Sequence, residues 1–284
     1  MALRVLLYGL FWIIFSYGLR FVVGGFFGFH ADAYSPQRIL QEDLLSFLAT
    51  LGAALLMAQF ERRPVEVYGL PRALAFAKLF WQGCLLGLVE ITLLISLIAA
   101  FAGYSFGSLS MHGLEAARWG GLWFVAFVCV GLYEEYLFRG YAQYTLAQGI
   151  GFWPAAIILS VLFGAGHLWN PGESYVGVAG VVATGLVFAF TLRRTGSLWL
   201  AVGWHASFDF GETFLYSVPD SGMVFAHHLS NAKLHGAAWL TGGSAGPEGS
   251  VLGFITLGVM AFATHLLFPA KKTESAQKLP DQTA

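Results

Sequence analysis

Six ionisable residues stand out because each lies in a long apolar stretch. They are Glu134, Glu135, Arg139, His167, His205 and Asp209. Charged groups at membrane depth are costly, so they usually face a protein interior or a wet cavity and have a function there. Carboxylates beside imidazoles in such a cavity are suited to general acid–base chemistry on a water molecule.

Helical spacing separates the roles of these residues. Glu135 and Arg139 are four residues apart with the acid first, which is the favourable order for an intrahelical ion pair. Glu134 points about 100° away from Glu135 around the helix, so it lies outside that pair. His205 and Asp209 are also four residues apart and share one helix face. The spacing predicts one neutralised acid and one acid left free to act as a base.

The composition is that of a polytopic membrane protein. Of the 284 residues, 57% are hydrophobic and 11% are charged, and the mean hydropathy is +0.67. Soluble domains carry about a quarter charged residues. The net charge of -1 indicates nothing about partners, but the lack of a basic face argues against nucleic acid. Cys84 and Cys129 lie in apolar runs and form no disulfide or metal motif.

Apolar stretches of about 20 residues predict transmembrane helices. Eight such stretches predict an all-α membrane helix bundle, with spans at roughly 5–28, 43–60, 79–102, 117–148, 152–168, 175–192, 197–216 and 251–269. We expect one transmembrane domain over residues 1–270, with its catalytic half at about 117–216. The polar tail 271–284 is predicted to be disordered.

Positive charges orient the bundle. With eight spans, both termini lie on one side, and that side carries ten Lys and Arg residues against three on the other. The ten are Arg4, Arg62, Arg63, Arg72, Lys78, Arg193, Arg194, Lys271, Lys272 and Lys278, and the three are Arg38, Arg118 and Lys233. Because cytoplasmic loops carry the excess of Lys and Arg, both termini are predicted to be cytoplasmic.

The predicted turns place the ionisable residues at similar depth. Glu134 lies 15 residues before Gly149, and His167 lies 16 residues after Gly151, so both are roughly 22–24 Å from that turn. A second turn on the same side, at Gly196, precedes His205 by 9 residues, or roughly 14 Å. Three separate segments are therefore predicted to meet in one site.

Each pattern also has a structural interpretation. The two acids and Arg139 are compatible with an interfacial ion-pair network, and a single membrane histidine is more often a packing residue than a catalyst. Glu90 and Arg20 lack neighbouring ionisable residues. We expect them to have structural roles, paired with each other or with polar groups. The convergence of three segments favours a functional site.

Three motifs, in this order and on separate spans, resemble those of a known family. They are Glu134-Glu135-x-x-x-Arg139, Phe163-x-x-x-His167 and His205-x-x-x-Asp209, and they resemble the CPBP family, the type II CAAX prenyl endopeptidases and their bacterial relatives. The longer run from His167 through Asn170 to Gly172, and the run 194–199, resemble the bacterial branch. The resemblance covers about residues 120–215.

This resemblance implies an intramembrane endopeptidase that needs no cofactor. Glu134 with His167 would activate a water molecule, and His205 with Asp209 would hold the oxyanion. The supporting residues would be Glu135, Arg139, Phe163 and Asn170.

Position 209 departs from the prenyl endopeptidases, which have Asn there. Asn donates a hydrogen bond to an oxyanion, whereas an ionised Asp repels it. Some bacterial relatives carry Asp at this position. Asp209 is therefore expected either to be protonated or to orient His205.

Other functions remain open at this point. A zinc protease would use His167, His205 and Glu134 as ligands, although the chain has no H-E-x-x-H motif. A non-enzymatic scaffold or immunity protein, or a proton-coupled transporter, would also hold ionisable residues in the membrane. For the protease we expect a peptide or membrane-protein substrate in a bacterial cytoplasmic membrane. The sequence determines neither the substrate's identity nor the oligomeric state.

Overall fold

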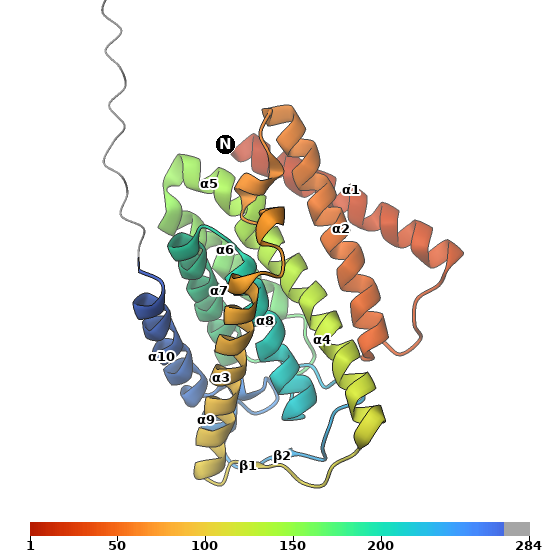
Figure 1. The fold of residues 1–284 in the computed structure, drawn as a ribbon, viewed down its shortest axis with the longest axis vertical. Helices are drawn as coiled ribbons and strands as arrows, with labels where there is room; N and C mark the ends of the chain where they lie inside the picture. Colours follow the sequence, from red (N-terminus) through yellow and green to blue (C-terminus); the bar gives the residue numbers. More distant parts are fainter. Residues whose placement is uncertain (270–284) are drawn as a thin grey trace, which may run out of the picture.

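The computed structural model describes residues 1–269 and shows a bundle of helices (Figure 1). The helices are α1 (Ala2–Phe26), α2 (Pro36–Glu61), α3 (Lys78–Ala100), α4 (Gly113–Glu135), α5 (Gln143–Ile150), α6 (Phe152–His167), α7 (Tyr175–Thr195), α8 (Trp199–Phe210), α9 (Ala238–Thr241) and α10 (Val251–Leu267). Two π-helical segments, η3 (Tyr136–Ala142) and η4 (Gly211–Leu215), continue α4 and α8. The short 3-10 helices are η1 (Val65–Tyr68), η2 (Arg72–Leu74) and η5 (Pro247–Gly249), and the strands are β1 (Tyr104–Ser105) and β2 (Lys233–Leu234).

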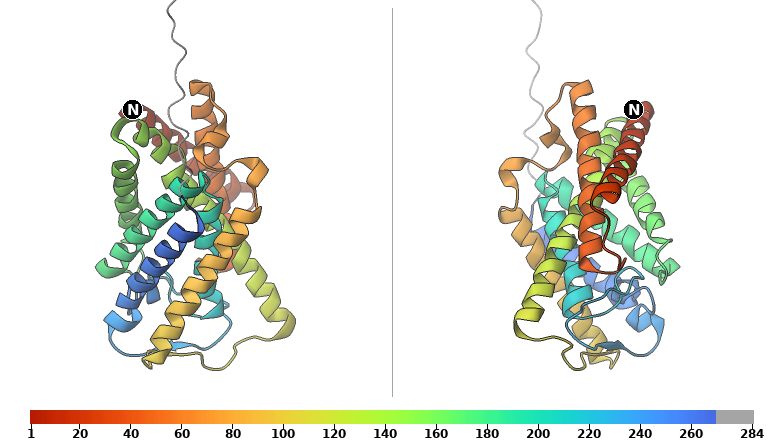
Figure 2. Two further views of the ribbon diagram at one scale, coloured as in Figure 1. Left: turned by 60° about the vertical axis from the view of Figure 1, so that its left-hand side comes forward. Right: turned by 90° about the vertical axis from the view of Figure 1, so that its right-hand side faces the viewer.

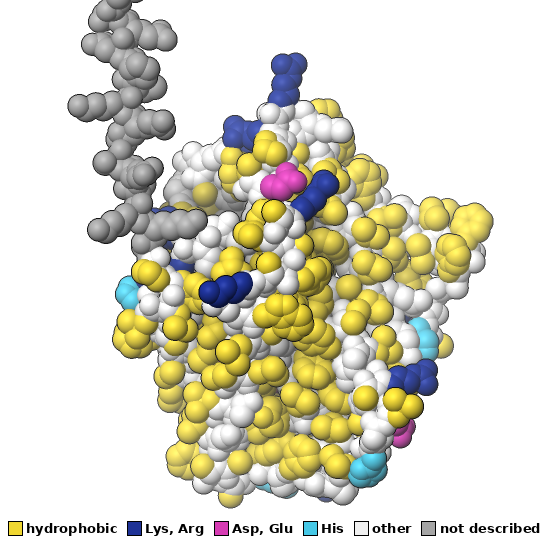
Figure 3. Space-filling model, in the orientation of Figure 1, with side chains coloured by type: hydrophobic (Ala, Val, Ile, Leu, Met, Phe, Trp, Pro, Cys, Tyr) yellow, Lys and Arg dark blue, Asp and Glu magenta, His cyan; other side chains and the backbone are white. Residues whose placement is uncertain are grey.

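The all-α prediction is confirmed, and each predicted span corresponds to a helix. Five helical stretches are long and apolar enough to cross a membrane, namely Ala2–Phe26, Pro36–Glu61, Lys78–Ala100, Gly113–Ile150 and Tyr175–Thr195, while α6 and α10 are shorter apolar helices. Hydrophobic side chains cover most of the middle and lower part of the face in Figure 3. The chain is thus an integral membrane protein. The predicted disorder of 271–284 lies outside the described residues.

The loops divide between the two ends of the bundle, as an eight-span topology requires. At one end, the Leu198 N–H donates to the Gly69 carbonyl, which joins the start of α8 to the loop before α3. At the other end, loop 217–250 pairs its strand β2 with β1, and its Ala226 N–H donates to the Tyr34 carbonyl before α2. Figure 2 shows this loop gathered at the lower end of the molecule. We call this end the loop end.

The opposite end is the basic end. The cations in its loops and helix ends are Arg4, Arg62, Arg63, Arg72, Lys78, Arg193 and Arg194. Most of the Lys and Arg side chains visible in Figure 3 lie toward this upper end. Arg4 forms an ion pair with Glu61 there, and the Arg63 guanidinium donates to the Tyr144 hydroxyl at 2.7 Å. The asymmetry of charge predicted from the sequence is therefore an asymmetry between two ends of the folded bundle.

Helix α8 lies at the centre of the bundle because small residues let α3 approach it closely. Its residues from Trp199 to Ser207 are all buried. A Cβ atom on Gly203 would lie 2.1 Å from the Phe80 carbonyl oxygen, and one on Gly83 would lie 2.1 Å from the Leu200 carbonyl oxygen. Small residues are common where membrane helices touch, since dispersion contacts drive their association.

We expect Gly203→Val to lower the free energy of unfolding by about 3 kcal/mol, the upper end for overpacking, because the backbone of α3 would have to move. Thermal unfolding of the purified protein in detergent measures the change. Gly121→Val is the matched control, since a Cβ at Gly121 meets nothing within 4 Å. Equal unfolding temperatures for the two variants would contradict the close α3–α8 contact.

Candidate active site

The carboxylates of α4 and α8 lie where each helix widens into a π-helical turn. Glu135 is the last residue of α4, and η3 begins at Tyr136. Asp209 lies two residues before Gly211, where η4 begins. Gly140 inside η3 has a non-helical ψ of -118°, and a Cβ there would lie 2.8 Å from the Tyr136 ring. Such π-helical turns occur frequently at functional sites.

The imidazole of His205 contacts three carboxylates. Its Nδ1 lies 3.1 Å from Glu135 Oε1, and its Nε2 lies 3.4 Å from Asp209 Oδ2 and 3.6 Å from Glu134 Oε2. Because an ionised carboxylate only accepts hydrogen bonds, the Nδ1 atom carries a proton and donates a hydrogen bond to Glu135. The orientation of the ring is therefore set from α4, while the Nε2 atom faces the two remaining carboxylates.

Glu135 and Arg139 form the ion pair that the i,i+4 spacing predicts. Arg139 Nη1 lies 3.3 Å from Glu135 Oε1, and both side chains are fully buried. The guanidinium carbon lies 4.4 Å from the centre of the Phe163 ring on α6, a cation–π arrangement that favours a desolvated cation. Glu135 thus contacts Arg139 and His205 with one oxygen, which connects the end of α4 to both α6 and α8.

His167 is held by its own helix. Its Nδ1 lies 2.9 Å from the Phe163 carbonyl oxygen, and the two rings have centroids 4.8 Å apart. A carbonyl oxygen only accepts, so Nδ1 carries the proton and Nε2 of the neutral ring is left as an acceptor. Just beyond α6, the Asn170 side-chain amide donates to the Ser221 carbonyl at 2.7 Å. Asn170 therefore joins the end of α6 to loop 217–250.

One cavity of about 150 Å³ contains the predicted catalytic residues. Its polar lining includes Glu134, His167, Asn170, His205 and Asp209. The side chains predicted to meet from three segments do share a site. Within the described residues, the ion pair of Glu134 is with His205, and it forms none with His167. Glu134 and His167 therefore face one cavity without forming an ion pair, and the cavity as a whole has room for water.

Other residues that line this cavity were not predicted from the sequence. They are Ile39, Asp43, Phe127, Val130, Asp220, Ser221, Met223 and Phe225. Asp43 was placed at the edge of a span, but α2 begins at Pro36, so Asp43 lies two turns inside the helix. The loop residues gave no signal, because nothing local in loop 217–250 shows that it folds back over the helices.

Two isolated ionisable residues each pair with a polar group and not with each other. The Trp204 indole N–H donates to Glu90 Oε2 at 2.6 Å, and Arg20 donates to the Ser46 hydroxyl at 2.8 Å. Glu90 lines a second, smaller cavity whose lining also includes His205.

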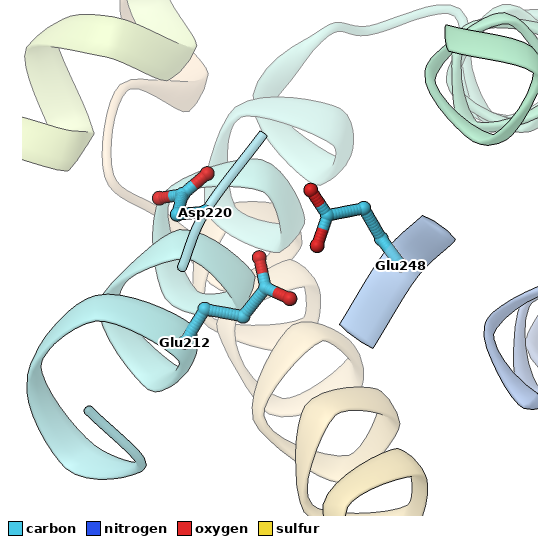
Figure 4. Close-up of side chains that lie close together, drawn as sticks. All are labelled: Glu212, Asp220 and Glu248. Carbon is cyan, nitrogen blue, oxygen red and sulfur yellow. The ribbon is translucent and has the colours of Figure 1, made fainter. Parts of the chain in front are cut away.

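A separate group of three acids lines the smaller cavity at the loop end. Among the described residues, one set of metal-ligating side chains has its ligand atoms within 4.8 Å of one another, namely Glu212, Asp220 and Glu248 (Figure 4). Burial, with the nearby carboxylates Asp209 and Glu248, raises the pKa of Asp220 well above its ordinary value.

The ligands required by the zinc alternative are arranged differently. Ligand atoms of one tetrahedral zinc ion lie roughly 3.3 Å apart. Glu134, His167 and His205 do not form a set within 4.8 Å in the described chain. A zinc ion bound by these three residues would require the side chains to move.

Comparison with known protein families finds a match to one part of the chain. Residues 116–211, about a third of the chain, match the family model described as Type II CAAX prenyl endopeptidase Rce1-like. The matched segment runs from α4 to the first residue of η4 and contains every predicted catalytic and supporting residue. A search of curated proteins found no match to this chain.

Proposed function

We propose that this integral membrane protein, whose residues 116–211 carry an Rce1-like segment, is an intramembrane endopeptidase that works as one helical domain. The observation that carries the proposal is the cavity of about 150 Å³ in which Glu134, His167, His205 and Asp209 meet from three helices. Carboxylates and imidazoles around a space for water are the groups that general acid–base hydrolysis requires.

In the proposed reaction, a water molecule lies between Glu134 and the Nε2 atom of His167. The Glu134 carboxylate takes a proton from this water as the oxygen attacks the carbonyl carbon of the scissile peptide bond. The π electrons of the peptide carbonyl move to the carbonyl oxygen, which becomes the oxyanion of a tetrahedral intermediate. As the C–N bond breaks, the proton on Glu134 passes to the leaving amine. Because the attacking group is water and not a side chain, no acyl-enzyme forms.

His205 is the proposed donor to the oxyanion. Glu135 accepts from its Nδ1, so a protonated ring directs its second N–H, on Nε2, toward Asp209 and Glu134 at the cavity. Asp209 lies 3.4 Å from that nitrogen. Of the two roles open for Asp209, the contact supports orienting the imidazole. This role explains how an acid can replace the Asn of the prenyl endopeptidases.

We propose that the hydrolysis needs no metal. The spacing of Glu134, His167 and His205 supports this proposal over the zinc alternative. The carboxylate–imidazole contacts also supply what the reaction requires: an acceptor for the water proton and a donor for the oxyanion.

The proposed location is a bacterial cytoplasmic membrane with both termini in the cytoplasm. The concentration of Lys and Arg at the basic end supports this orientation. The cavity is lined by loop 217–250 and by the first turns of α2, so it lies nearer the loop end. Phe127, Val130 and Phe225 give part of its wall an apolar surface. An apolar peptide or a membrane-protein segment is the substrate class that fits.

We expect His167→Ala to abolish the release of at least one protein fragment that the wild type generates, because the variant loses the acceptor for the attacking water. The measurement is quantitative mapping of new protein termini in membranes that express the wild type or the variant. His228→Ala is the matched control: His228 Nδ1 likewise bonds a carbonyl, that of Phe225, at 3.1 Å, but in loop 217–250.

Identical fragment patterns for the wild type and His167→Ala would reject the protease. A partner protein that co-purifies equally with the wild type and with His167→Ala, without any fragment that depends on His167, would instead establish the scaffold function.

A further inference from the structure

Three carboxylates converge at the loop end, one from the helix that continues α8 and two from opposite ends of loop 217–250. Glu212 comes from η4, Asp220 from loop 217–250, and Glu248 from η5 just before α10. Figure 4 shows their carboxyl groups turned toward a common centre, and one oxygen from each lies within 4.8 Å of the others. None of these acids has a part in the proposed hydrolysis.

Two of the three carboxylates are held in place by one oxygen each. The Thr213 hydroxyl donates to Asp220 Oδ2 at 3.0 Å, and the Ser221 backbone N–H donates to Glu248 Oε1 at 2.6 Å. The second oxygen of each group remains for another partner. Hydrogen bonds to one ligand oxygen that leave the other free are typical of the shell around a bound metal ion.

Glu212 points into this site, and one of its two carboxylate oxygens has no hydrogen-bond partner among the described residues. Its side chain is 1% exposed, and the oxygen concerned is Oε1. The Glu248 Oε2 atom is also buried and without a partner. Buried polar atoms are nearly always paired, and an exception calls for an explanation such as a bound ion.

The space and the charge around the site favour a cation. A cavity of about 60 Å³ is lined by all three acids, and its described lining includes no Lys or Arg side chain. Burying several ionised carboxylates together is strongly unfavourable, so a bound cation or protons must neutralise them. The cavity's histidines, His167 and His205, are held by the Phe163 carbonyl and by the α4 acids.

We propose that Glu212, Asp220 and Glu248 bind one Ca²⁺ ion. All the available ligands are oxygens, which suit Ca²⁺ and Mg²⁺ better than zinc or copper. Oxygens around one Ca²⁺ lie at about 2.3–2.6 Å from it, so two of them can be up to about 5 Å apart, whereas the Mg²⁺ distance of about 2.1 Å allows only about 4.2 Å. The spacing suits the longer metal–oxygen distance of Ca²⁺ better than that of Mg²⁺, and water completes the coordination.

This ion would fasten the loop end to the helix that carries the imidazole of the site. Glu212 follows His205 and Asp209 along the same continuous helix, while Asp220 and Ser221 line the catalytic cavity as well. Bound Ca²⁺ therefore ties α8, loop 217–250 and the start of α10 together. Its role is structural and is separate from the chemistry of hydrolysis.

The test is Ca²⁺ binding to the purified full-length protein in detergent, after removal of divalent ions with a chelator. We expect saturable binding of one Ca²⁺ per chain by calorimetry, and an unfolding temperature that rises with Ca²⁺ concentration, because the ion binds the folded state. Mg²⁺ at the same concentration should give a smaller rise. Glu248→Gln should lose both responses, whereas Glu115→Gln, at an exposed position on α4, should keep them.

A second readout keeps the proposal testable if Glu248→Gln fails to fold. Terbium ions occupy calcium sites and emit when a nearby indole absorbs light, and Trp204 lines the same cavity. Terbium emission from the wild type should be displaced by Ca²⁺. Absence of saturable Ca²⁺ binding, or binding that Glu248→Gln leaves unchanged, would overturn the proposal. So would a protein that is stabilised by acidic pH and shows no Ca²⁺ response, since the acids would then be sharing protons.

Discussion

Replacing Glu134 by Gln should reduce peptide hydrolysis by about 10²–10⁴-fold, the range that a general base contributes, and should leave the fold intact. Gln has the same shape but cannot take a proton from water. The side chain of Glu134 is 20% exposed, and its one ion pair among the described residues is the 3.6 Å contact with His205. Removing the Glu134 charge therefore leaves no buried charge without a partner, because His205 keeps its contacts with Glu135 and Asp209.

The measurement is the rate of cleavage of a substrate segment, identified by terminus mapping, by purified wild type and variant. Thermal unfolding of the same samples shows whether Glu134→Gln remains folded. Glu115→Gln, at an exposed position in the first turn of the same helix, controls for the loss of one carboxylate from α4. Full activity of Glu134→Gln would rule out Glu134 as the base.

The same preparation distinguishes the metal-free reaction from the zinc alternative. A chelator selective for transition metals should leave wild-type activity unchanged when Ca²⁺ is kept in the buffer. The Ca²⁺ matters because a chelator that also removes it would empty the proposed carboxylate site and destabilise the protein for another reason. Loss of activity with the selective chelator, together with stoichiometric zinc, would establish the zinc mechanism.

Glu135→Gln is expected to destabilise the protein by about 3–5 kcal/mol, the usual effect of removing one partner from a buried ion pair. Arg139 would remain fully buried without its carboxylate, and its Nε and Nη2 atoms already lack hydrogen-bond partners in the described chain. His205 would also lose the charged acceptor of its Nδ1 proton. Thermal unfolding and cleavage rates should therefore both fall.

A double variant separates the two consequences. Removing both charges in Glu135→Gln/Arg139→Met should recover most of the stability, since the uncompensated buried cation is gone. The maximal cleavage rate should stay low with little change in KM, because the carboxylate that orients His205 is still absent. Recovery of full activity in the double variant would show that Glu135 serves only to neutralise Arg139.

The approximate positions of the long apolar helices followed from the sequence alone because their cause is local, although α2 begins at Pro36, seven residues before the predicted span. A membrane span needs a continuous apolar run, so composition identified the helices that the structure contains. Helical geometry is equally local, and it correctly paired Glu135 with Arg139 and placed His205 with Asp209 on one face. Counting residues from the turns was enough to bring Glu134 and His167 to the same level.

Only the tertiary structure decided which atoms face each other. The sequence analysis treated Glu135 as a support for α4, but Glu135 also fixes the ring of His205 on α8. The sequence did not indicate a function for Glu212. The two acids that lie beside Glu212, Asp220 and Glu248, come from a loop whose path is set by long-range contacts. Helical periodicity also did not predict the π-helical turns that follow the two acid motifs. Local periodicity determines which residues can meet, and the packing of distant segments determines which of them do.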